Sequence, residues 1–96
     1  MEKVFVLTCD WDCGDGRENQ IYGVYANEDD AVAAMQEMWQ ADKIDSCFAG
    51  YFENGELKEE AENDGIDLEE RRTYIGICDQ YSPNFIEYCI TEHKVQ

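Results

Sequence analysis

Between positions 31 and 39, apolar residues recur at the three- and four-residue intervals of an α-helix. Asn27 lies just before this segment and is a preferred N-cap residue, and the acids at positions 28 to 30 favour the positive end of a helix dipole. The spacing therefore predicts a helix that begins after Asn27, ends near positions 41–43 and packs one stripe against a sheet rather than binding a ligand. That stripe consists of Ala31, Val32, Met35, Met38 and Trp39, and the exposed face carries Asp29, Asp30, Gln36, Glu37 and Gln40.

Four segments rich in β-branched and aromatic residues predict strands, at positions 3–13, 18–26, 71–79 and 85–94. The turn signal Gly14-Asp15-Gly16 joins the first two in an antiparallel hairpin. Both faces of this hairpin are apolar, and one helix covers a single face. We therefore expect the other face to be covered by the middle segment or by a second copy of the chain. In the first strand the two faces carry Phe5, Leu7, Cys9 and Trp11 on one side and Val4, Val6 and Thr8 on the other.

The middle of the chain supports two interpretations. Asn54-Gly55 is a hairpin-turn dipeptide between apolar Phe52 and Leu57, whereas positions 56–63 contain helix-favouring residues. Positions 53–70 form an acidic insert with Lys58 as the one base before the arginine pair that starts the third strand. We predict a single domain over residues 1–96: an α+β fold with an antiparallel four-stranded sheet, ordered β-β-α-insert-β-β, and one main helix on one face.

The charge narrows the classes of function. The 96 residues include 23 acids and 7 Lys or Arg, for a formal net charge of −16. This charge opposes direct binding to nucleic acid, because phosphates are repelled. It favours a basic protein partner, cations or a high-salt habitat. The acids cluster rather than spread evenly, which favours a binding face.

Five cysteines are present, and none forms a CxxC pair. Three of them lie in apolar strand-like runs, where a free Cys behaves as a small apolar side chain. We expect a cytoplasmic protein, and therefore buried, reduced thiols. A zinc site made of Cys9, Cys13, Cys47 and His93 matches no standard ligand spacing. No apolar run is long enough to span a membrane.

Catalytic motifs are missing from the sequence. Asp10, Asp12 and Asp15 suggest a calcium loop, but the EF-hand pattern fails because Gly14 and Ile21 stand where acids are required. Three carboxylates at a hairpin end can still attract a hard cation. His93 is the one histidine, and no phosphate loop, GxSxG or HExxH motif occurs. We predict a non-enzymatic protein without a cofactor or a resident metal.

The segments KVFVLTCDWDCGDG and IYGVYANEDDAVAAM resemble small proteins of phages and mobile elements. In size and charge the chain also resembles phage-encoded anti-defence proteins, including anti-CRISPR and anti-restriction DNA mimics. The resemblance implies an inhibitor that blocks a basic, nucleic-acid-handling protein such as a nuclease or CRISPR effector. The alternative is a small structural or regulatory domain that forms a homodimer through the uncovered sheet face, with acidity serving solubility. The acids expected to bind a partner are Asp10, Asp12, Asp15, Asp29, Asp30, Glu37, Glu53, Glu56, Glu59, Glu60, Glu62 and Asp64.

Overall fold

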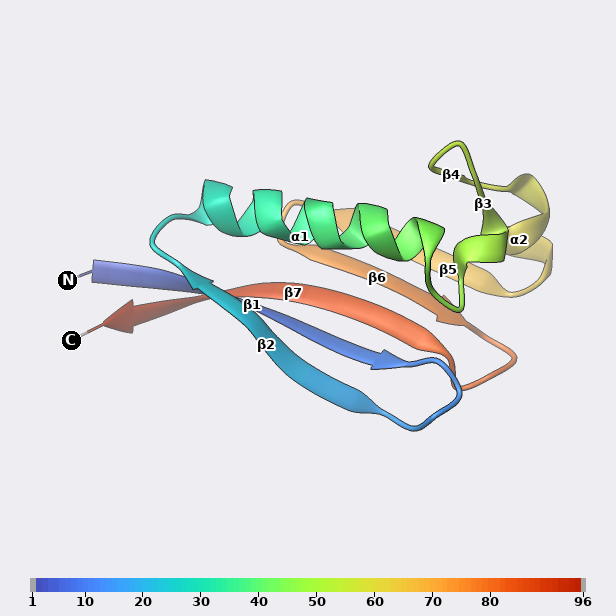
Figure 1. The fold of residues 1–96 in the computed structure, drawn as a ribbon, viewed down its shortest axis with the longest axis horizontal. Helices are drawn as coiled ribbons and strands as arrows, with labels where there is room; N and C mark the ends of the chain where they lie inside the picture. Colours follow the sequence, from blue (N-terminus) through green and yellow to red (C-terminus); the bar gives the residue numbers. More distant parts are fainter. Residues whose placement is uncertain (1, 96) are drawn as a thin grey trace.

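The computed structural model describes residues 2–95, which form one sheet layer with helices on one of its faces (Figure 1). All neighbouring strands of the main sheet are antiparallel, in the order β2-β1-β7-β6-β5. A separate two-stranded sheet joins β3 and β4. The elements are β1 (Glu2–Asp12), β2 (Glu18–Tyr25), α1 (Glu28–Ile44), a 3₁₀ turn (Ala49–Tyr51), β3 (Phe52–Glu53), β4 (Glu56–Leu57), α2 (Glu59–Asn63), β5 (Ile66–Arg71), β6 (Tyr74–Asp79) and β7 (Phe85–Val95).

The predicted α+β class, antiparallel sheet and single main helix are confirmed, but the sheet has five strands rather than four. The missed strand is β5, and all of it except Arg71 lies within the predicted acidic insert. Ile66 is buried and Leu68 half-buried, while the acids between and after them are exposed. Apolar inward residues and exposed acids therefore alternate in β5, but the many acids made this segment look like a charged loop. The strand tolerates these charges because it lies at the edge of the sheet and is open to water. The third predicted strand consequently begins at Tyr74 rather than at Arg71.

Helix α1 forms as its cap and stripe predict. The Asn27 side-chain oxygen accepts a hydrogen bond from the Asp30 backbone N–H at 2.9 Å. The side chains of Ala31, Met35 and Trp39 are fully buried against the sheet, where they meet inward residues of the central strands. Those inward residues include Leu7, Cys9, Ile75, Ile77, Ile86, Tyr88 and Ile90. The Trp39 ring also packs edge-on against Phe52, with centroids 5.5 Å apart.

Both interpretations of the middle segment are correct, each for its own part. Asn54 and Gly55 adopt positive φ values of 55° and 81°, as a tight hairpin turn between β3 and β4 requires. The helix-favouring residues after it form the short helix α2. This segment lies on the same side of the sheet as α1, and its Phe48 and Ala61 are buried in the same core (Figure 1). It therefore does not cover the second sheet face, where Ile21 and Val24 remain exposed.

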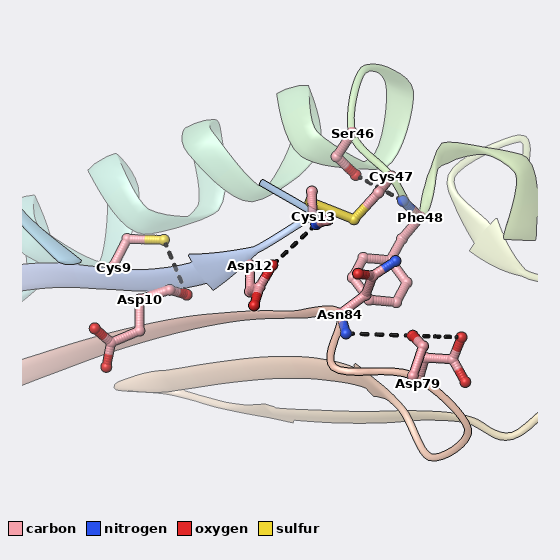
Figure 2. The surroundings of a disulfide bond; sticks show 11 residues. Cys9, Asp10, Asp12, Cys13, Ser46, Cys47, Phe48, Asp79 and Asn84 are labelled. Carbon is pink, nitrogen blue, oxygen red and sulfur yellow. Dashed lines mark hydrogen bonds between the residues drawn. A yellow bond between two sulfur atoms is a disulfide. The ribbon is translucent and has the colours of Figure 1, made fainter. Parts of the chain in front are cut away.

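The prediction that all five cysteines are reduced is wrong. Cys13, just after β1, forms a disulfide with Cys47, 34 positions further on and beyond the end of α1. The fold brings the two together because the β1–β2 hairpin ends beside the last turn of α1 (Figure 2). Cys9, Cys78 and Cys89 are free and lie in strands, as expected of small apolar side chains.

Candidate partner-binding surface

The first group of predicted binding residues lies at the tip of the β1–β2 hairpin. Asp10 is half-buried and accepts hydrogen bonds from Arg17, at 3.3 Å, and from Asn19. Asp12 accepts a 2.9 Å hydrogen bond from the Gly14 backbone N–H, which stabilises the turn (Figure 2). Asp15 is exposed and forms no ion pair within residues 2–95. Asp10 and Asp12 therefore shape the hairpin, and Asp15 is the carboxylate of this group that is free to meet a partner.

The second group lies on α1. Arg72 donates hydrogen bonds to Glu28, at 2.6 Å, and to Asp29, so the arginine compensates the charge of Asp29. These hydrogen bonds to carboxylates, first to Glu28 and then to Asp29, raise the pKa of Arg72. Asp30 accepts a 3.0 Å hydrogen bond from the Asn27 side chain. Glu37 is exposed in the middle of the helix.

The third group occupies the acidic insert. All of its predicted binding residues are exposed, and none forms an ion pair within residues 2–95. The β3–β4 turn and the start of α2 enclose a shallow concavity of ≈ 330 Å³, whose rim includes four carboxylates and Lys58. This is the largest set of uncompensated charges among the predicted residues, and it consists of Glu53, Glu56, Glu59, Glu60, Glu62 and Asp64.

These groups do not form one continuous patch. The described chain extends 47 Å along its longest axis. The β1–β2 tip, the end of α1 and the insert lie toward one end of that axis, whereas the start of α1 lies toward the other (Figure 1). The Cys13–Cys47 disulfide ties the tip to the segment that leads into the insert (Figure 2). We call this end, with Asp15 and the insert acids from Glu53 to Asp64, the acidic end.

A site that sequence reasoning missed lies between the hairpin and the end of α1. It is a cavity of ≈ 360 Å³, whose walls include Trp11, Tyr22 and Asp42. The Trp11 and Tyr22 rings stack with centroids 6.3 Å apart. Gly23 pairs with Leu7 and Ile21 pairs with Thr8, so Tyr22 is an extra residue without a partner on β1. This β-bulge turns the Tyr22 side chain to the same side of the sheet as α1. The position of Asp42 in the sequence was a signal for this cavity. Asp42 follows Trp39 by three residues and so places a carboxylate on the buried stripe of the helix.

Asp42 is the half-buried carboxylate of this cavity, and the Tyr88 hydroxyl donates a hydrogen bond to it. Burial raises the pKa of Asp42, although the hydrogen bond from Tyr88 acts in the opposite direction. Burial and the nearby Asp42 charge raise the pKa of the Cys9 thiol to about 12, so Cys9 stays protonated. Burial also raises the pKa values of Tyr22 and Tyr88. Neutral hydroxyl and thiol groups thus surround the one half-buried carboxylate of the cavity, Asp42.

The zinc and hard-cation alternatives receive no support from the geometry. Cys13 and Cys47 are joined to each other and offer no thiolate. Within residues 2–95, no group of three or more His, Cys, Asp or Glu side chains lies close enough to hold a metal ion. None of the helices in that range is long and apolar enough to cross a membrane.

Comparisons of the chain with protein-family models, curated proteins and solved structures gave no match.

Proposed function

We propose that this chain is a non-enzymatic inhibitor that binds a basic groove of a nucleic-acid-handling protein, such as a nuclease or a CRISPR effector, in the cytoplasm of a host bacterial cell. The resemblance to acidic anti-defence proteins suggests this class. The observation that carries the proposal is the acidic end, where exposed carboxylates of the insert have no basic partner within residues 2–95. Inhibition is steric and electrostatic, and it needs no chemical step.

Electrostatics supports such a partner. The backbone that carries these carboxylates is held in a hairpin and a short helix, so little backbone freedom is lost when they bind. With a net charge of −16, the chain attracts a basic surface over distances of about one Debye length, ~10 Å at 0.1 M salt. Electrostatic steering of this kind raises the association rate and weakens as salt is added. Direct binding to DNA or RNA is disfavoured by the same charge.

The test is charge reversal at the acidic end. The variant Glu59→Lys/Glu60→Lys/Glu62→Lys should lose binding to its partner at low salt. A matched control reverses Glu2, Glu70 and Glu92, which changes the net charge equally but alters exposed residues outside the acidic end. If both variants bind equally well at low salt, the acidic end is not the contact surface.

The partner is sought by a pulldown from a bacterial lysate whose nucleic acid has been digested, washed first at low and then at high salt. A specific nucleic-acid-handling protein that is released by salt supports the proposal and identifies the target. The pulldown is run with and without a thiol reductant, because cytoplasmic thiols reduce most disulfides and the reduced chain must also bind there. Capture that occurs only without reductant contradicts the proposed cytoplasmic setting.

A second candidate function is a homodimeric structural or regulatory domain. The specific observation in its favour is the open sheet face, on which Ile21 and Val24 are 62% and 60% exposed. Salt separates the two candidates, because added salt screens the repulsion between two acidic copies and weakens attraction to a basic partner. Light scattering that shows a dimer strengthened by salt, together with no captured partner, would favour the homodimer.

A further inference from the structure

The cavity beside Asp42 has a composition suited to a planar organic cation. Its walls combine aromatic side chains, a half-buried carboxylate and a second carboxylate at the rim, Asp45. Trp11 and Tyr22 are half-buried, so part of each side chain remains open to a ligand. Electron-rich ring faces attract cations, and the attraction grows as the cation loses water. A partly open site that combines ring faces with a half-buried carboxylate therefore favours a positive group over a neutral one.

Within residues 2–95, no cation pairs with the carboxylate of this site. One Asp42 oxygen accepts the Tyr88 hydroxyl, and within residues 2–95 no other hydrogen bond and no ion pair reaches the carboxylate. Lys43 follows Asp42 directly, but its ammonium group donates to the Gly55 carbonyl and lies over the Trp39 ring. A half-buried carboxylate without a cation is electrostatically unfavourable, and a bound cation relieves that cost.

The molecule already uses the same combination of groups elsewhere. The Arg17 guanidinium lies 5.6 Å from the centre of the Phe85 ring and is 3.3 Å from an Asp10 oxygen. The guanidinium of Arg71 lies 4.9 Å from the centre of the Tyr74 ring and pairs with Glu69. In both places an arginine joins a ring face to a carboxylate, and the Asp42 cavity offers the ring and the carboxylate without the arginine.

We propose that the cavity lined by Trp11, Tyr22 and Asp42 binds the guanidinium group of an arginine side chain from a partner protein. Guanidinium suits it better than ammonium, because it is planar, weakly hydrated and able to stack on a ring while donating to a carboxylate. This inference rests on the proposed function, for which it names an anchoring contact. Arginines are abundant in the phosphate-binding grooves of nucleic-acid-handling proteins, and this cavity lies at the end of the molecule where the acidic insert lies.

The Cys13–Cys47 disulfide forms part of the wall of this cavity, together with Ser46. The cross-link joins the end of β1 to the segment after α1, and so ties together the two elements that bring Trp11 and Asp42 to the cavity. A preorganised site loses less freedom when a ligand binds. Reduction should therefore weaken guanidinium binding without abolishing it.

The inference is tested on the full chain with Nα-acetyl-arginine amide as the probe and the neutral isostere Nα-acetyl-citrulline amide as its control. Binding is followed by the NMR signals of the two indole N–H groups. The Trp11 signal should shift and saturate, and the signal of Trp39, which is fully buried, should stay in place. Citrulline amide should bind at least about tenfold more weakly, since it has the shape but not the charge.

Variants then locate the contact. Asp42→Asn keeps an acceptor for the Tyr88 hydroxyl and should weaken arginine amide binding about tenfold or more, whereas Asp64→Asn removes an equal charge outside the cavity and should not. Equal binding of citrulline amide, an unmoved Trp11 signal or an unaffected Asp42→Asn variant would each overturn the inference. Equal binding of n-butylammonium or tetramethylammonium would overturn the preference for guanidinium.

The two proposals fail separately. If the Glu59/Glu60/Glu62 reversal abolishes capture of a partner and Asp42→Asn does not, the proposed function stands and the cavity is not its anchor. If arginine amide binds as expected and no partner is captured, guanidinium binding by the cavity is supported and the proposed function is contradicted.

Discussion

Reduction of the Cys13–Cys47 disulfide removes a cross-link that closes a loop of 34 positions in the unfolded chain. The loop-closure relation gives about 12–13 cal/mol/K for a loop of this length, or about 4 kcal/mol at 25 °C. Domains of this size have total stabilities of about 5–15 kcal/mol, so the cross-link accounts for a large share. The corresponding fall in Tm is about 15–30 °C.

The assay is equilibrium urea unfolding of the oxidised chain with and without a phosphine reductant, followed by far-UV circular dichroism. The double variant Cys13→Ser/Cys47→Ser should match the reduced protein and show no response to the reductant. Its native state should change little, because Cys13 is only half-buried and Cys47 is exposed. Cys78→Ser is the matched control, since it removes a thiol that is free and should leave the reductant effect unchanged.

A small effect of the reductant would contradict a stabilising role for the Cys13–Cys47 disulfide. If the reductant lowers the free energy of unfolding by less than about 1 kcal/mol, the unfolded chain does not gain the expected freedom. The cross-link would then be a consequence of the fold rather than one of its supports. A loss of about 4 kcal/mol with the reduced chain still folded would show instead that the core alone suffices.

Four further outcomes are expected from single substitutions. Trp39→Ala should cost about 3–5 kcal/mol in urea unfolding, because the ring is fully buried. Trp39→Phe should cost much less, since it keeps a ring beside Phe52 and removes an indole N–H that is buried without an acceptor in residues 2–95. Asn27→Ala should cost about 1 kcal/mol by removing the α1 cap, measured in the same way. Asp42→Asn should alter how the free energy of unfolding depends on pH. Burial raises the pKa of Asp42 above its value in the unfolded chain, so the native state binds the proton more tightly. The stability of the wild type therefore falls as pH rises through the native pKa. The variant should lack this fall, and its stability relative to the wild type should be higher at pH 7 than at pH 4; an equal difference at both pH values would contradict the assignment.

Local signals in the sequence specify much of the secondary structure. The α1 helix follows from a cap and an apolar stripe within 17 residues, and the Asn54-Gly55 turn follows from a dipeptide. Strands β1, β2, β6 and β7 follow from β-branched and aromatic runs. In each case the interacting groups are close in sequence, so the pattern itself contains the physical cause.

The acidic end was only partly predictable. The sequence shows which residues carry carboxylates. Which of these charges are compensated by a basic side chain depends on residues that are distant in sequence. Asp29 meets Arg72, which is 43 positions away, whereas the acids from Glu53 to Asp64 form no ion pair within residues 2–95. The edge strand β5 was hidden because its exposed acids dominate its two inward residues.

The fold class, the main helix, the hairpin turns and the net charge follow from local patterns and composition, because each depends on residues that are neighbours in the chain or on residue counts alone. Tertiary packing, in contrast, pairs the first strand with the last at the centre of the sheet and brings Cys13 to Cys47. It also decided that Trp11, Tyr22 and Asp42, from three elements, line one cavity. The reason is physical: such contacts form only when a sheet and a helix pack around a shared core, and no short stretch of the chain contains both partners.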